Sequence, residues 1–215
     1  MQILFEDREI TVAIKPTDCV SEQTARGDGF ADLLAARHGS RYIGVVHRLD
    51  RGVGGVMVYA KTPSAAAKLS SQVQNRTFQK KYLAVVHGSP SEASGRLCDL
   101  LFHDRIKNKT YTVDRKRNGV KEAILDYECL GTIHDGQLGS VSLLAITLQT
   151  GRTHQIRVQF SSRGLPLVGD RKYGAPSKGE IALFCTALSF CHPKSGEFLT
   201  FSQKPVGELW SVFEA

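Results

Sequence analysis

Short runs of apolar residues, separated by polar and glycine-containing segments, recur along most of the chain. Runs of this kind, bounded by turn residues, are typical of β-strands. The pattern predicts strands at residues 3–5, 10–14, 43–46, 56–60, 78–86, 97–102, 111–113, 123–130, 141–148, 182–190 and 198–201. Only an acidic turn separates the first two runs, so they are predicted to form a hairpin, which Pro16 ends because proline cannot continue a ladder.

Three segments show helical signals instead. Apolar residues recur at helical spacing over 30–39, and Thr62 followed by proline starts a helix over 62–75. Thr153 is predicted to cap a short third helix. Strands outnumber helices, and hairpin-like joins outnumber strand–helix–strand units. We therefore predict an α+β fold in which a mixed, mainly antiparallel sheet carries flanking helices, with residues 1–215 forming a single domain.

Composition narrows the class of protein. The 215 residues are 41% hydrophobic, which excludes a disordered chain or a fibrous repeat. Lys and Arg total 28 against 21 Asp and Glu, a net charge of +7, which favours a polyanionic partner but equally fits a generally basic soluble protein. The five cysteines are scattered, without metal-ligand spacing, so we expect reduced thiols and no metal site. With no apolar run of membrane length and no signal pattern, we expect a cytoplasmic protein that does not bind membranes.

The segment His47-Arg-Leu-Asp-Arg51, followed by glycines, lies between two predicted strands. Loops on a rigid scaffold are where reactive groups are presented. Asp50 is flanked by Arg48 and Arg51, and neighbouring cations favour an ionised carboxylate, which can act as nucleophile or base. A simple ion pair between Asp50 and Arg51 at a turn is the alternative interpretation.

The segment Thr150-Gly-Arg-Thr-His-Gln-Ile-Arg157 leads from a turn into a helix start. Backbone N–H groups there, together with Arg152, could hold a phosphate, and Arg157 could reach a buried carboxylate or a nucleic-acid phosphate. An ordinary cap with solvated arginines explains the same residues.

Three further segments carry candidate contacts. Tyr82, after Lys80 and Lys81, opens an apolar strand and is either a core residue or a ring that stacks on a base. The segment 166–174, which includes Asp170, taken alone indicates a turn with solvated charges. The basic stretch 105–121 is either a solvated face or a surface that grips a phosphate backbone.

Four of these segments, HRLDR with its glycines, KKYLAVVHG, LQTGRTHQIRV and PLVGDRKYG, occur in that order after the opening ILFEDREITVAIKP. Together they resemble the RluA-type pseudouridine synthases over roughly residues 3–190. The resemblance implies a pseudouridine synthase fold with a basic active-site cleft. It also implies isomerisation of uridine to pseudouridine in structured RNA, without cofactor or metal.

The resemblance also implies roles for individual residues. Asp50 is the expected catalytic aspartate, Arg157 its expected partner, and Tyr82 the ring expected against the target uracil. Arg48 is expected to fill the space left by the extruded base. We expect the RNA contacts to include the following residues: Arg48, Arg51, Lys80, Arg152 and His154.

The chain departs from the family pattern beside the aspartate. Gly52-Val-Gly-Gly55 stands where Asp-Thr-Ser-Gly is usual, and Gln159 follows the Arg-Val pair where His is common. We expect an RNA pseudouridine synthase for a tRNA or rRNA stem-loop, acting as a monomer without an N-terminal RNA-binding domain. A catalytically inactive RNA-binding or RNA-folding protein on the same fold is the alternative. A carboxylate-based N-glycosidase, with Asp170 as its second acid, is a third.

Overall fold

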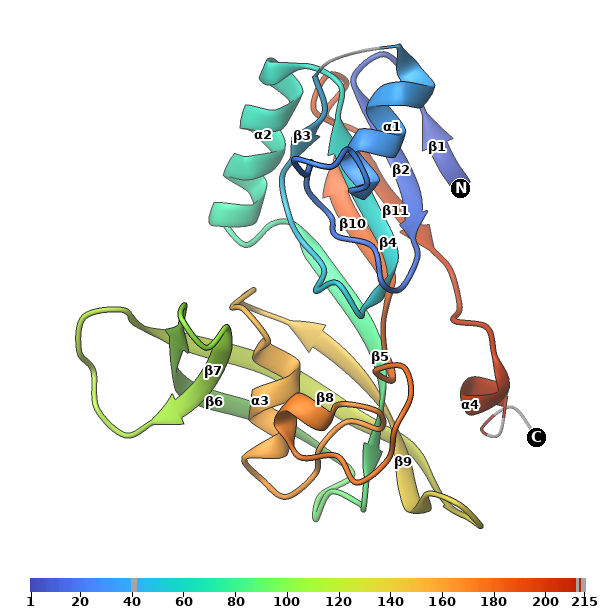
Figure 1. Ribbon diagram of the computed structural model, residues 1–215. Coiled ribbons are helices and arrows are strands. Elements are labelled where there is room, and N and C mark those ends of the chain that lie inside the picture. The colour runs from blue at the N-terminus through green and yellow to red at the C-terminus, as the bar shows by residue number, and fades with distance from the viewer. Residues whose placement is uncertain (40–41, 212, 214–215) are drawn as a thin grey trace. The chain divides into compact units, whose positions relative to one another are not determined.

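The computed structural model describes residues 1–39, 42–211 and 213. The chain divides into two compact units, which are described separately (Figure 1). Unit 1 contains Met1–Lys80 and Phe184–Pro205, and unit 2 contains Lys81–Leu183 and Val206–Ala215.

Unit 1 is a small sheet with two helices. Its strands lie in the order β1-β2-β4-β10, with β3 on β4 and β11 on β10. The pairs are antiparallel except β4 with β10, which is parallel. The elements are β1 (Gln2–Glu6), β2 (Ile10–Lys15), α1 (Phe30–His38), β3 (Gly44–Val45), β4 (Gly54–Ala60), α2 (Pro63–Gln74), β10 (Leu183–Cys191) and β11 (Phe198–Ser202).

The local signals in unit 1 act as predicted. Thr62 accepts a 3.1 Å bond from the N–H of Ala65 and so caps α2. Gly39 ends α1 in the left-handed conformation that glycine favours. Every residue of β4 is buried, because the strand lies between β2 and β10. This central strand leads directly from the loop that carries Asp50.

Unit 2 is built on a sheet in the order β5-β9-β8-β6-β7, in which β9–β8, β8–β6 and β6–β7 are antiparallel. Strand β5 (Gln79–His87) leads the chain into this unit. The other elements are β6 (Ser94–Asp104), β7 (Lys109–Val113), β8 (Val120–Asp135), β9 (Gly139–Leu148), α3 (Gln155–Ser161), the 3-10 turn η1 (Arg171–Tyr173) and α4 (Glu208–Ser211).

The predicted strands and helices are all present, with differences at their ends. Strands β6 and β8 extend several residues beyond their apolar runs, because two-stranded ladders continue where the sheet face is solvated. The prediction that Thr153 caps α3 is wrong: His154, at φ 54°, occupies that position and gives no side-chain cap bond. Turn η1 and helix α4 are too short for a periodic signal. None of the described helices has the length and hydropathy needed to cross a bilayer.

Candidate active site

The loop between β3 and β4 is fixed by residues that alternate between the interior and solvent. His47 and Leu49 are buried, Arg48 is exposed, and Asp50 is half-buried. Nε2 of His47 accepts the N–H of Val58 at 3.2 Å. Burial lowers the pKa of His47 to about 3, so its ring is neutral. The ring therefore serves as a hydrogen-bond acceptor that ties the loop to β4, and not as an acid.

The hydroxyl of Ser21 fixes the backbone of this loop at Leu49. Ser21 Oγ donates to the carbonyl of Leu49 at 2.9 Å and accepts the N–H of Leu49 at 3.1 Å. The carbonyl of Ser21 in turn accepts a 3.0 Å bond from the hydroxyl of Tyr59. The backbone immediately before Asp50 is therefore held on both of its polar groups by the interior of unit 1.

A buried ammonium lies under the same loop. Lys15 is fully buried, and its Nζ donates to the carbonyls of Pro16 at 2.7 Å, Cys19 at 2.6 Å and Arg51 at 3.3 Å. Burial lowers the pKa of Lys15 to about 8, an effect that Cys19, Asp50 and Asp18 oppose without cancelling. A cation therefore supports the backbone on the far side of Asp50 and interacts electrostatically with its carboxylate.

The basic residues predicted to contact RNA in unit 1 differ in exposure. Arg48 is exposed and pairs with Glu22 at 2.7 Å. Arg51 is exposed and donates from Nε to the carbonyl of Asp18 at 3.2 Å. This N–H therefore binds the neighbouring loop, whereas the alternative interpretation paired Arg51 with the Asp50 carboxylate. Lys80 is half-buried, and burial lowers its pKa.

Two glycines that follow the Asp50 loop have packing reasons: Gly54, which departs from the family pattern, and Gly55, which agrees with it. Gly55 has φ 133°, and a Cβ there would collide with the carbonyl oxygen of Cys185 on the neighbouring strand. A Cβ on Gly54 would meet Lys15 and Phe184 at 3.3 Å. Val53 is buried. Gly54, which stands where the family pattern has a serine, therefore allows β4 to lie close to both β2 and β10.

In unit 2, Arg157 forms a two-point salt bridge. Its Nε lies 2.6 Å from Asp170 Oδ2, and its Nη2 lies 2.9 Å from Asp170 Oδ1. The side chains are 7% and 0% exposed, respectively. The prediction that Asp170 is a solvated turn residue is wrong, because the turn folds its carboxylate inward while exposing Arg171 and Lys172. A carboxylate held in this way is not placed to activate water, which removes the basis of the glycosidase alternative.

The ring of Tyr173 packs on this ion pair. The Arg157 guanidinium lies 5.0 Å from the centre of the Tyr173 ring. The hydroxyl of Tyr173 lies 2.9 Å from Nδ1 of buried His154 and accepts the N–H of Thr110 at 2.8 Å. Arg157 and His154, which belong to the same motif, are thus joined through one tyrosine.

The side chain of Gln155 binds the polar groups that precede α3. Gln155 Oε1 accepts the N–H of Arg152 at 2.9 Å and the hydroxyl of Thr150 at 2.8 Å. Arg152 also donates from Nε to the carbonyl of Glu122 at 2.9 Å. The N–H of Arg152, which the sequence suggested as a phosphate donor, therefore already has a protein acceptor.

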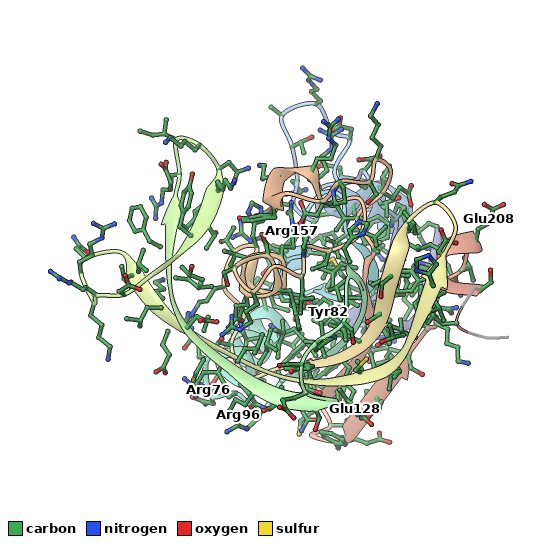
Figure 2. All side chains as sticks on the ribbon, turned by 90° about the horizontal axis from the view of Figure 1, so that it is seen from below. Arg76, Tyr82, Arg96, Glu128, Arg157 and Glu208 are labelled. Carbon is green, nitrogen blue, oxygen red and sulfur yellow. The ribbon has the colours of Figure 1, made fainter. Side chains whose placement is uncertain are left out.

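Tyr82 lies on β5 and is 6% exposed. Tyr82 and Arg157, which both belong to unit 2, are labelled in Figure 2, and both are buried. Beyond Tyr82 this strand is mostly buried, with Ala84, Val85 and Val86 removed from solvent in succession.

Sequence reasoning missed three supporting residues, Lys15, Ser21 and Asp170. Lys15 ends an apolar strand, where a lysine usually reaches solvent, and no local signal shows that its ammonium turns inward. Ser21 lies in a polar loop. Asp170 had the best available signal, because it lies in a motif together with the tyrosine that packs on Arg157.

Comparisons with known proteins agree with the motifs. A family model described as RNA pseudouridylate synthase matches residues 9–162. An uncharacterized RNA pseudouridine synthase of Synechocystis is 34% identical, over 93% of this chain and 64% of its own length. Another, YlyB of Bacillus subtilis, is 33% identical, over 94% of this chain and 68% of its own length. Ribosomal large subunit pseudouridine synthase D of Zymomonas mobilis is 29% identical, over all of this chain and 72% of its own.

The solved structures confirm the predicted fold class. Human RNA Pseudouridylate Synthase Domain Containing 1 has a TM-score of 0.77 at 23% identity, over 95% of this chain and 83% of its own. Human RNA Pseudouridylate Synthase Domain Containing 4 has the same score and identity, over 99% of this chain and 91% of its own. The chain spans just under two thirds of the Synechocystis relative, at 64%.

Proposed function

This chain belongs to the RNA pseudouridylate synthase family, in its RluA-type branch, and from that premise we propose that it isomerises specific uridines to pseudouridine in structured RNA. The observation that carries the proposal is the Asp50 loop. Its backbone is held by Ser21 on one side of the aspartate and by Lys15 on the other. Such fixation is what a catalytic carboxylate needs, because its position must not change as the substrate rotates.

Asp50 is the proposed catalytic residue. The reaction breaks the bond between the ribose and the base nitrogen, rotates the uracil, and joins it again through carbon. An ionised Asp50 either attacks the anomeric carbon or removes a proton from the ribose, and the two routes need the same charge state. The Lys15 ammonium, which also holds the backbone after Asp50, interacts electrostatically with the Asp50 carboxylate.

Arg157 is the proposed partner of Asp50, with Asp170 as the residue that positions it. A guanidinium has five N–H donors, so its two bonds to Asp170 are compatible with a second carboxylate. The salt bridge fixes the plane of the guanidinium and so the direction of its other donors. Tyr82 is proposed to stack on the target uracil, which could contribute about 1–3 kcal/mol to holding the extruded base.

The RNA surface is proposed to include Arg48, Arg51 and Arg152 as phosphate contacts, with Arg48 occupying the space of the extruded base. Lys80 and His154 would contribute through the limited part of each side chain that solvent reaches. The net charge of +7 supports a polyanionic substrate. A stem-loop of tRNA or rRNA in the cytoplasm, bound by a monomer, is the proposed setting.

The test uses RNA labelled with tritium at carbon 5 of uracil, because joining the ribose to that carbon releases the label. Total RNA from cells that lack this protein is incubated with the purified protein. We expect time-dependent tritium release, and mapping of the product should locate it at specific uridines. RNA binding without tritium release would instead support the inactive RNA-binding protein, the alternative that the loop glycines suggest.

A further inference from the structure

The hairpin of β6 and β7 in unit 2 ends in a turn over residues 105–108 that presents an isoleucine to solvent. The Ile106 side chain is 99% exposed, more than any other large apolar residue in the part of the chain that the structure describes. It therefore contributes no burial to the folded state. An isolated exposed apolar residue is common on protein surfaces, so its surroundings must show whether it has a use.

The turn that carries Ile106 is ordered by its own hydrogen bonds. Asp104 Oδ1 accepts the N–H of Ile106 at 2.9 Å and that of Lys107 at 3.0 Å. Asn108 adopts φ 45°, and its carbonyl accepts a 3.0 Å bond from Lys172 Nζ. The backbone that carries the apolar side chain is thus ordered by hydrogen bonds.

The hairpin is also fixed at its base. The N–H of Thr110 donates to the Tyr173 hydroxyl at 2.8 Å, and the Thr110 hydroxyl donates to the carbonyl of Thr153 at 2.9 Å. Tyr173 packs on Arg157, and β7 contacts α3 (Figure 1). The tip therefore has a fixed relationship to the helix that carries Arg157.

The charge around Ile106 is complementary to nucleic acid. Arg105 and Lys107 flank it and are exposed, while the carboxylate nearest in the sequence, on Asp104, is engaged by the backbone of the turn. A groove of about 330 Å³ lies between the hairpin and α3, with Lys109 and Tyr111 on one wall. Cations with an aromatic wall are the features that proteins use to bind single-stranded nucleic acid.

We propose that Ile106 is a wedge that inserts into the base stack next to the target uridine, while Arg105 and Lys107 hold the adjacent phosphates. This proposal rests on the proposed function and names the contact that opens the RNA. Apolar side chains inserted between base steps unstack them, and phosphate contacts fix the register of the protein. Extruding a base has a free-energy cost, which an inserted aliphatic side chain lowers by replacing the lost stacking.

The test separates the wedge from the cations. Tritium release is measured under single-turnover conditions with saturating protein, on 5-tritiated total RNA from cells that lack this protein, and affinity is measured by filter binding. For Ile106→Ser we expect a rate lower by about 10-fold or more with an affinity within about threefold of wild type. For Arg105→Gln combined with Lys107→Gln we expect weaker binding and a shallower salt dependence, by about 0.7 log units for each phosphate that the variant no longer neutralises.

Val206→Ser is the matched control, because Val206 is also an exposed aliphatic residue of unit 2, at 86%. It should keep the wild-type rate, and all three variants should keep the wild-type melting temperature. An Ile106→Ser rate equal to wild type on active protein would overturn the wedge and leave the proposed function standing. A wild type that releases no tritium would overturn the proposed function, and the wedge with it.

Discussion

Arg157 and Asp170 form a two-point salt bridge in the interior of unit 2, with N–O distances of 2.6 and 2.9 Å. Both side chains are almost fully removed from solvent. Two parallel N–H···O bonds fix a guanidinium more tightly than one, so the orientation of Arg157 depends on Asp170. This relationship makes Asp170 a positioning residue for an arginine proposed to act on Asp50.

Asp170→Asn should therefore destabilise the protein and reduce its activity. Removing one charge of a buried pair leaves the other uncompensated, which typically costs about 3–5 kcal/mol. The free energy of unfolding is measured in denaturant, together with the rate on RNA. Asp126→Asn is the control, because Asp126 pairs with Arg96, which is 64% exposed. That substitution should cost no more than about 1 kcal/mol, and equal costs for the two variants would contradict the account.

Lys15 should give the stability of the protein a distinctive pH dependence. Its pKa is about 8 in the folded chain against an ordinary value of 10.5, so the unfolded chain binds more protons between these values. The free energy of unfolding should therefore carry a penalty below about pH 8 that is relieved as the pH rises towards 10.5. The shift corresponds to about 3 kcal/mol.

The Lys15→Met variant isolates this contribution. The difference in unfolding free energy between wild type and Lys15→Met is measured at about pH 7 and about pH 10, where other groups titrate equally in both proteins. The wild type should gain relative to the variant at the higher pH. Because three carbonyls lose their donor, the variant should also lose activity through the Asp50 loop. A difference that does not change with pH would show that Lys15 is not titrated in this range.

Gly55→Ala should destabilise unit 1 strongly. At φ 133° the backbone strain of a non-glycine residue is about 1–3 kcal/mol, and the added Cβ also collides with the Cys185 backbone. Thermal melting compares it with Gly136→Ala, where a Cβ would meet nothing within 4 Å. If both variants melt at the same temperature, the close approach of β4 and β10 is not a constraint.

RNA affinity should fall steeply with salt. Each phosphate neutralised by Lys or Arg contributes a slope of about 0.7 log units of affinity per log unit of salt on single strands. Filter binding from low to moderate salt measures the total slope. A flat response would mean that the excess of 28 basic over 21 acidic residues is incidental to RNA binding.

The sequence was informative where local signals decide the structure. Thr62 capped its helix, and the alternating runs became strands, because these depend on neighbouring residues. The buried side chains that support the site could not be predicted in this way. The carboxylate of Asp170 turns inward to a partner 13 residues away, and the ammonium of Lys15 bonds two nearby carbonyls and one 36 residues away. Spacing along the chain reveals neither arrangement. Family motifs selected Asp50, Tyr82 and Arg157, whose roles stay predictions.

The catalytic role of Asp50 is tested most directly by comparing Asp50→Asn with Asp18→Asn. Both change one carboxylate near Lys15 to an amide of the same shape, and Asp18 has φ 58°, which asparagine tolerates. Pseudouridine formation on total RNA is measured with RNA affinity as the control. The account predicts that Asp50→Asn forms no product while binding RNA within about a few-fold of wild type, since counterion release by Lys and Arg is unchanged, and that Asp18→Asn stays active. Turnover by Asp50→Asn well above background would contradict it.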